Sequence, residues 1–151
     1  MSSLGFALLD RHVVDGHGDD VACSDGSETL TYARLLERSA ALGGGLRVLG
    51  VRPGDEVAVT VPSGNLQVVI VCACIRIGAV PGHRGEVRIA EVGEQVRVQK
   101  DEHDIELAVL LKAGAADPAP SQKDDPPGYD SQARTVFTGT IAALLAGKTV
   151  A

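Results

Sequence analysis

The stretch that decides the fold is residues 28–62, which read ETLTYARLLERSAALGGGLRVLGVRPGDEVAVTVP. Thr31 suits a helix N-cap because its hydroxyl oxygen can accept a backbone N–H, and Gly50 suits the left-handed position that ends many helices. The sequence therefore predicts a helix over residues 32–49. The apolar run 57–61 follows the next turn and predicts a strand buried on both faces, as in a parallel sheet.

The flanking residues extend this unit in both directions. Upstream, residues 21–24 and 28–30 predict two strands joined by a turn at Asp25 and Gly26, which makes a β-hairpin. Downstream, residues 66–77 are apolar on nearly every side and predict a helix that leads into another strand. Strand–helix–strand units are parallel and right-handed. We therefore expect an α/β fold with a mostly parallel sheet, helices on both faces and an N-terminal β-hairpin.

Three consecutive glycines, Gly43 to Gly45, lie inside the predicted helix. Each costs about 1 kcal/mol relative to alanine in a helix interior. Their presence predicts either a break in the helix or the close packing of another element against it.

The chain is long enough for one domain with a hydrophobic core. Residues 86–90 and 94–100 alternate polar and apolar side chains and predict two strands with one solvated face, joined at Gly93. Residues 105–113 predict a helix, and the Pro- and Asp-rich residues 115–130 predict an exposed linker. The predicted parts of this single domain, residues 1–151, are a first α/β part (1–82), divergent strands and a helix (83–113), a linker (114–130), and a final helix and strand (131–151).

Several short motifs carry a family resemblance. They are Leu30-Thr31-Tyr32, Gly50-Val51-Arg52-Pro53-Gly54-Asp55 and Gly78-Ala79-Val80, in this order along the chain. Over about residues 28–82 the chain resembles the N-terminal part of the adenylate-forming (AMP-binding) superfamily, which includes acyl-CoA synthetases, acyl-AMP ligases and the adenylation domains of peptide synthetases. The resemblance implies the fold of the N-terminal subdomain of these enzymes. Because members of the superfamily are several times longer, it also implies a truncated relative.

The sequence lacks the motifs that the superfamily uses for adenylation. The superfamily uses a Ser/Thr/Gly-rich loop around the ATP phosphates, an acid on the ribose, a Glu on magnesium and a distal Lys. The nearest match to the loop is residues 135–140, TVFTGT, which lack a second glycine and a Pro-Lys pair, and whose spacing fits a helix over 131–146. We therefore expect no cofactor and no ATP-dependent ligation by this chain alone. Whether it has another enzymatic activity stays open.

The sequence indicates no catalytic residue, but it offers one candidate ligand site. Ser63 and Gly64 follow the buried strand, and His83 and Arg84 follow the next strand. Ligands of α/β proteins bind beyond the carboxyl ends of parallel strands, so these four residues are predicted to line one crevice. The alternative is that they form ordinary connections between strands and helices.

Two polar clusters are weaker candidates for a metal or acid–base site. The first cluster has no defined ligand spacing, so we predict a solvated loop and no metal; it consists of His12, Asp15, His17, Asp19 and Asp20. The second cluster consists of consecutive residues, which on a turn do not face one another; they are Glu102, His103 and Asp104.

Composition limits the partners and the compartment. A net charge of −6, with two Phe, two Tyr and no Trp, argues against nucleic-acid binding. The longest apolar run, residues 68–75, is too short to span a bilayer. Three cysteines, an odd number without zinc-site spacing, predict reduced thiols in a cytoplasmic protein.

Two functions of different class fit these observations. The first is an adenylation-incompetent accessory or interaction subunit for a ligase, a carrier protein or a biosynthetic enzyme. The alternative is a small repurposed enzyme of secondary metabolism that acts on a small molecule near Ser63, His83 and Arg84. An inactive remnant of a ligase is a third reading.

The apolar helix over residues 66–77 bears on association. A chain of this size has little else to cover such a helix, which favours self-association or a protein partner. The alternative is that the helix over 131–146 folds back and covers it.

We predict that Cys72 and Cys74 react slowly with a thiol reagent in the native protein. Both lie on the all-apolar helix, and burial raises the pKa of a thiol and hides it from the reagent. Labelling followed by mass spectrometry, with and without denaturant, measures the difference. Fast native labelling of either cysteine would show that the helix is exposed.

Overall fold

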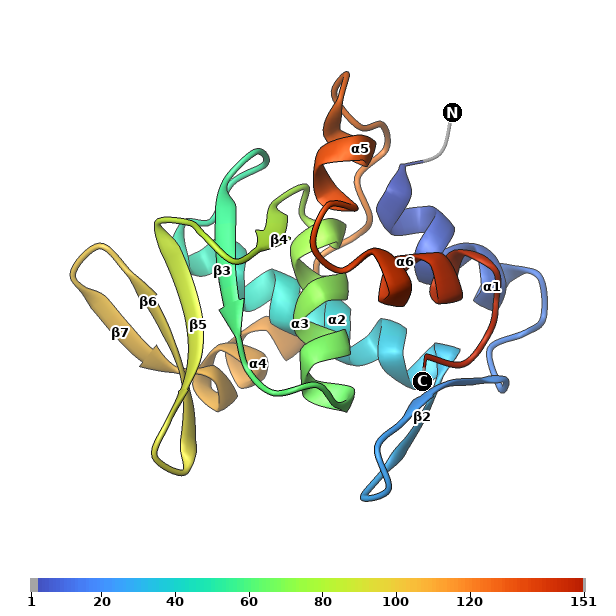
Figure 1. Cartoon of the computed structure of the whole chain (residues 1–151), viewed down its shortest axis with the longest axis horizontal. Helices are drawn as coiled ribbons and strands as arrows, with labels where there is room; N and C mark the ends of the chain where they lie inside the picture. Colours follow the sequence, from blue (N-terminus) through green and yellow to red (C-terminus); the bar gives the residue numbers. More distant parts are fainter. Residues whose placement is uncertain (1–2, 151) are drawn as a thin grey trace.

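The protein is a mixed α/β domain, described here by a computed structural model over residues 3–150. A five-stranded sheet has the order β4-β3-β5-β6-β7, and a separate two-stranded sheet is the hairpin β1-β2 (Figure 1). The strands are β1 Val21–Ser24, β2 Thr29–Thr31, β3 Glu56–Thr60, β4 Val80–Gly82, β5 Val87–Val92, β6 Gln95–Lys100 and β7 His103–Glu106. The helices are η1 Phe6–Asp10 (a π-helix), α1 Arg11–Val14, α2 Tyr32–Leu49, α3 Asn65–Arg76, α4 Leu107–Ala115, α5 Tyr129–Ala133 and α6 Thr138–Leu145. The predicted α/β class and the N-terminal hairpin are confirmed.

Helix α2 has the predicted caps and passes through its three glycines without a break. Thr31 Oγ1 accepts the backbone N–H of Arg34 at 3.2 Å, and Gly50 ends the helix at φ 106°. A Cβ atom on Gly45 would overlap the carbonyl oxygen of Leu110 in α4, and one on Gly114 would overlap the carbonyl oxygen of Ala41 in α2. The two helices therefore cross backbone to backbone, which is one of the two alternatives that the glycine run predicted.

The sheet combines parallel and antiparallel pairs. Strand β3 pairs in parallel with β4 and β5, whereas β5, β6 and β7 form an antiparallel meander. The inward side chains Val57, Ile89 and Val98 are buried on the face that α3 and α4 contact. Outward residues such as Arg88 and Gln99 are exposed. The predicted solvated face of β5 and β6 is therefore confirmed, and over these strands the helices lie on one side.

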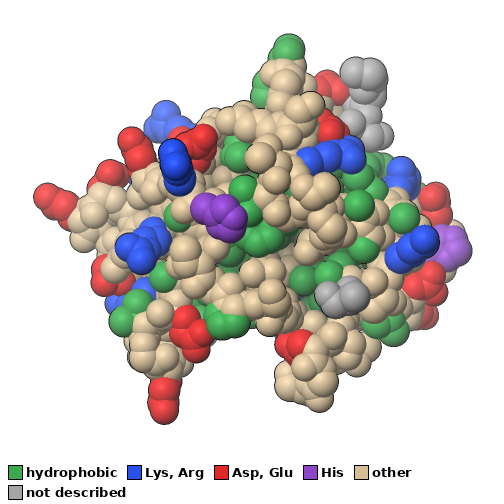
Figure 2. All heavy atoms as spheres, viewed as in Figure 1, with side chains coloured by type: hydrophobic (Ala, Val, Ile, Leu, Met, Phe, Trp, Pro, Cys, Tyr) green, Lys and Arg blue, Asp and Glu red, His purple; other side chains and the backbone are tan. Residues whose placement is uncertain are grey.

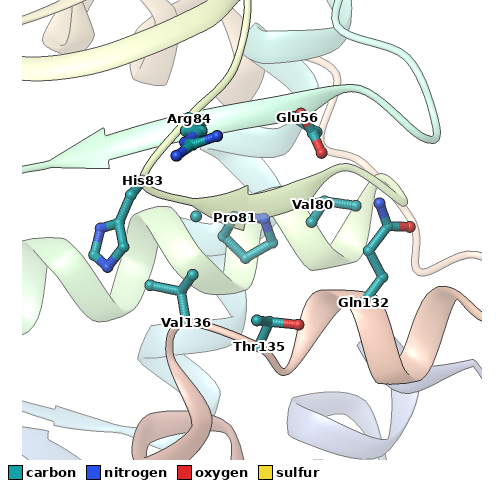
Figure 3. Close-up of a pocket in the computed structure, with 9 residues that line it drawn as sticks. Glu56, Val80, Pro81, His83, Arg84, Gln132, Thr135 and Val136 are labelled. Carbon is teal, nitrogen blue, oxygen red and sulfur yellow. The ribbon is translucent and has the colours of Figure 1, made fainter.

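The connection from β4 to β5 crosses the sheet. Strands β4 and β5 lie on opposite sides of β3, so residues 83–86 pass over β3 (Figure 3). A Cβ atom on Gly85 would overlap the carbonyl oxygen of Glu56. Glycine therefore permits this loop to lie directly on the β3 backbone.

Two expectations for the second half of the chain are corrected. The helix predicted over 105–113 begins only at Leu107, because Ile105 pairs with Val98 in the sheet. The single helix predicted over 131–146 is two helices, because residues 134–137 are not helical. There the hydroxyl of Thr138 bonds the carbonyl of Arg134, a local alternative to helical hydrogen bonding.

The predicted linker is tied to the domain at particular points. Residues 116–128 form no helix or strand, yet Ala119 is buried and donates its N–H to the carbonyl of Ala40 at 2.9 Å. A carboxylate oxygen of Asp125 accepts the N–H of Leu4 at 2.7 Å. The segment is thus part of the packed structure, although it has no regular hydrogen bonding.

One chain encloses the apolar helix α3. Every residue of α3 from Val68 to Arg76 is buried. The C-terminal segment folds back along η1 and α1 (Figure 1), with Ile141 and Leu144 fully buried. The broad apolar surface on which association was predicted is therefore covered within residues 3–150, and self-association stays a prediction without that support.

Replacing Gly114 by alanine should lower the free energy of unfolding by roughly 1–3 kcal/mol, because the new methyl group must push α4 away from the Ala41 carbonyl. Urea unfolding followed by circular dichroism measures the change. Gly139→Ala is the matched control: Gly139 lies in α6 with no atom within 4 Å of an added Cβ, so its effect should be near zero or slightly stabilising. An unchanged urea midpoint for Gly114→Ala would contradict the backbone contact.

Candidate functional site

Three adjoining pockets lie around the C-terminal segment, β4 and the residues that follow β3. The His83 pocket, of about 370 Å³, lies between β4 and α5 (Figure 3) and is lined by Glu56, Val80, Pro81, Gly82, His83, Arg84, Gln132, Thr135 and Val136. The Ser63 pocket, of about 330 Å³, is lined by Cys23, Ser24, Asp25, Ser63, Gly64, Asn65, Gln67, Val68, Thr140 and Val150. The Val136 pocket touches both and is lined by Val136, Phe137, Gly139, Thr140, Ala143, Thr149 and Val150.

The structure divides the four predicted ligand residues between two pockets. Ser63 and Gly64 line one pocket, whereas His83 and Arg84 line another. The cause is the loop 83–86, which turns across β3 and so leads away from the residues that follow β3. Neighbours in the sequence therefore remain together, the two pairs do not share a crevice, and the ligand-binding role of each pair stays a prediction.

The His83 pocket combines a buried apolar floor with an exposed polar rim. Val80, Pro81 and Gly82 are buried, whereas His83 and Arg84 are exposed. The hydroxyl of Tyr129, at the start of α5, donates to the carbonyl of Ala79 at 2.6 Å, and this bond holds α5 against β4. The position of the α5 wall relative to the floor is therefore fixed by a buried hydrogen bond.

The polar groups around this pocket differ in charge and in origin. Figure 3 places Arg84 and Glu56 over β3, with Gln132 and Thr135 on the opposite wall. The His83 ring lies 6.4 Å from the Phe137 ring, centroid to centroid, at an interplanar angle of 52°. A guanidinium, an imidazole, a carboxylate, an amide and a hydroxyl thus surround one opening. The sequence reading missed Glu56, Gln132 and Thr135, because nothing local marks them as neighbours of His83.

The Ser63 pocket is organised by Asp25, which the sequence reading treated only as a turn residue. Its Oδ1 accepts the N–H and the hydroxyl of Ser27, at 3.1 and 2.7 Å, and the N–H of Glu28 at 3.2 Å. Its Oδ2 accepts the N–H of Asn65 at 3.1 Å. The Ser27 hydroxyl, followed by the N–H groups of Asn65, Ser27 and Glu28, holds the pKa of Asp25 well below its usual range. Asp25 therefore docks the tip of the hairpin onto the start of α3.

All three cysteines are buried thiols. Cys23 lines the Ser63 pocket, but only 2% of it is exposed, and burial raises its pKa to about 11. Burial also raises the pKa of Cys74 to about 12, and that of Cys72 higher. The predicted burial of Cys72 and Cys74 is confirmed, and none of the three is in a disulfide.

The remaining sequence candidates do not form sites. His12 is buried and its Nε2 bonds the carbonyl of Leu144 at 2.6 Å, while His17 Nδ1 lies 3.4 Å from a carboxylate oxygen of Asp20. Asp104 pairs with Arg97 at 2.9 Å on the exposed edge of the sheet. Across residues 3–150 no group of three or more His, Cys, Asp or Glu side chains is placed to hold a metal ion. Within the same residues, none of the helices has the length and apolar character needed to cross a membrane.

The charges on the surface are mixed. Figure 2 shows acidic and basic side chains interspersed over the visible face, with neither sign gathered into a single patch. On this face the side chains therefore form no continuous basic surface of the kind that nucleic-acid binding uses.

Residues 10–82 match the family model of the AMP-binding enzymes. An acetyl-coenzyme A synthetase of Streptomyces avermitilis is 40% identical over 82 residues, which are 51% of this chain and 13% of that protein. A salicylyl-CoA synthase / salicylate adenylyltransferase of a Streptomyces species is 40% identical over 74 residues, 46% of this chain and 13% of that protein. A longer match, 31% identical over 133 residues, covers 80% of this chain and 19% of an acetyl-coenzyme A synthetase of Cupriavidus necator. The chain thus spans only a small part of the length of these relatives.

Two solved structures are similar in fold over about half of this chain. An anthranilate CoA ligase in complex with anthranoyl-AMP superposes with a TM-score of 0.49 at 19% identity, over 52% of this chain and 15% of that one. Apo MatB from Rhodopseudomonas palustris superposes with a TM-score of 0.49 at 24% identity, over 54% of this chain and 16% of that one.

The charge of Asp25 should stabilise the fold in a pH-dependent way. Because its pKa in the folded protein is depressed, the stabilisation is present above the unfolded pKa of roughly 3.9 and is lost as the pH falls toward the folded value. Asp25→Asn should therefore unfold at a lower temperature than the wild type at pH 7, and the gap should narrow below roughly pH 4.

Thermal unfolding at several pH values measures this gap. Asp19→Asn, which removes an exposed carboxylate from the loop before β1, is the control and should give little change at any pH. A gap that is constant from pH 7 to pH 3 would show that the charge of Asp25 does not hold the hairpin.

Proposed function

Because residues 10–82 match the family model of the AMP-binding enzymes, we propose that this chain is a non-adenylating relative of those enzymes that works through contact with another protein. The partner is a ligase, a carrier protein or another enzyme of the same biosynthetic route. The proposal includes a cytoplasmic location, which the three unpaired cysteines support.

The observation that carries the proposal is the local structure of residues 135–140. A loop that holds ATP phosphates must offer free hydroxyls and free backbone N–H groups. Here the Thr138 hydroxyl bonds the Arg134 carbonyl at 2.5 Å, and the Thr135 hydroxyl bonds the Ser131 carbonyl at 3.2 Å. These contacts make the segment a junction between α5 and α6, and they support a scaffold that has lost phosphate binding in this part of the chain.

The C-terminal segment closes on the N-terminal half of the chain. The Tyr32 hydroxyl donates to the Lys148 carbonyl at 2.6 Å, and the Val150 N–H donates to the Ala22 carbonyl at 2.7 Å. These bonds join the C-terminal segment to the hairpin and to α2. The C-terminal segment thereby packs against the part of the chain that matches the AMP-binding family model.

The purified chain should give no ATP–pyrophosphate exchange with acetate or salicylate, the acids suggested by the names of its relatives. The physical reason is that the charge developing on the phosphates finds no preorganised donors. Exchange of radioactive pyrophosphate into ATP measures this, with a full-length acetyl-coenzyme A synthetase as the positive control. Robust ATP–pyrophosphate exchange by the chain alone would contradict the proposal.

The same assay tests the accessory role. The chain is mixed with the AMP-binding ligase encoded nearest to it, and the mass of the mixture is measured by light scattering. The proposal expects a stoichiometric complex and an altered exchange rate for that ligase, whereas an unrelated protein of the same size should change neither. Separate species with an unchanged rate would remove this ligase as the partner and leave the carrier protein to be tested in the same way.

A further inference from the structure

The loop 83–86 holds Arg84 in a defined place above the sheet. The loop lies on the β3 backbone, where the close approach of Gly85 to the Glu56 carbonyl prevents it from shifting inward. The pairing of β5 with β3 begins again at Val87. The backbone of Arg84 is therefore held from both ends, and its guanidinium stands at the rim of the His83 pocket (Figure 3).

Arg84 is one of the five arginines, out of ten in the chain, that have no carboxylate partner among residues 3–150. No ion pair within 4.0 Å involves Arg84 in the described part of the chain, and the same is true of Arg11, Arg47, Arg52 and Arg88. The arginines that do pair with a carboxylate are Arg34, Arg38, Arg76, Arg97 and Arg134. Among the unpaired ones, Arg84 lines the pocket of β4 and α5, and its planar guanidinium suits carboxylate or phosphate oxygens.

The rest of the pocket suits a ligand with an apolar body. Val80, Pro81 and Gly82 are buried below it, and the Val136 side chain lies 3.5 Å from a Cβ atom built on Gly82. Gln132 adds an amide from the α5 wall. The volume of about 370 Å³ falls in the range of small-molecule sites.

Glu56 limits the charge of the ligand. It is exposed on the same rim as Arg84 and has no ion pair within 4.0 Å among residues 3–150. A second anionic group on a ligand would meet this carboxylate and be repelled. The rim thus favours one anionic head group over two.

From these contacts we propose that the His83 pocket binds a small organic anion, with one carboxylate or phosphate head group held by Arg84 and His83 and an apolar body lying on Val80, Pro81 and Val136. This site is independent of the accessory role, since it requires no second protein. Of the four ligand residues predicted from the sequence, this site includes His83 and Arg84. It also includes Glu56, Gln132 and Thr135, which line the same pocket.

The test is a nuclear magnetic resonance titration of the full ¹⁵N-labelled chain with benzoate, phenyl phosphate and inorganic phosphate, at an ionic strength kept constant with sodium chloride. At least one of the two aromatic anions should produce saturable shifts in the amides of residues 83–85 and 132–136. The tighter of the two identifies the head group. Inorganic phosphate should bind more weakly than phenyl phosphate, because it lacks the apolar body.

Two matched variants distinguish binding of the anion in this pocket from its nonspecific attraction to any exposed arginine. Arg84→Gln should weaken binding about tenfold or more, the size expected for a lost hydrogen bond to a charged group. Arg47→Gln removes another exposed, unpaired arginine, on α2, and should leave the affinity unchanged. Both positions are exposed, so the spectra of the variants should match the wild type away from the substitution.

Three results would overturn the proposal. The first is the absence of saturable shifts with both aromatic anions at millimolar concentration. The second is an affinity that Arg84→Gln and Arg47→Gln reduce equally, which would show only nonspecific attraction to positive charge. The third is inorganic phosphate binding as tightly as phenyl phosphate, which would show that the apolar floor takes no part.

Discussion

The arrangement of the domain depends on the contact between the backbones of α2 and α4. Glycines in both helices remove the side chains that would otherwise separate them, and the carbonyls of Ala41 and Leu110 lie where Cβ atoms would stand. Each glycine weakens its own helix, and the dispersion contacts of two closely packed backbones offset that loss. Because α4 follows β7 directly, this contact also determines where the meander β5–β7 joins the sheet beside β3.

A buried arginine ties three separate segments to the same core. The Arg76 guanidinium donates to both carboxylate oxygens of Asp10, at 2.6 and 3.1 Å, and to the carbonyl of Ala119 at 2.6 Å. Only 7% of the Arg76 side chain is exposed. Buried pairs of this kind select one arrangement over others more than they add stability. The interaction explains how residues 116–128 hold their place without regular structure.

Local signals in the sequence were enough for the elements that rely on local chemistry. The cap at Thr31, the end of α2 at Gly50 and the alternation of β5 and β6 all have causes within a few residues, and all were predictable. The crossing of residues 83–86 was not, because it depends on a contact with Glu56 far along the chain. The break at 134–137 was missed although the bond from Thr138 to the Arg134 carbonyl is local. For the candidate site the same limit applies: His83 and Arg84 are adjacent and stayed together, but the walls that face them come from β3 and α5.

The pairing of Val150 with the hairpin affects how the protein is made. The Val150 N–H bonds Ala22, and Thr149 bonds Val21, across a separation of 128 residues. Contacts so distant in sequence form slowly, because the intervening chain must first lose its freedom. On the ribosome the hairpin cannot gain this neighbour until residue 150 has left the exit tunnel. Until then the packing of the N-terminal half stays incomplete, and its apolar helix α3 is not fully covered. During that interval the nascent chain can bind chaperones or aggregate.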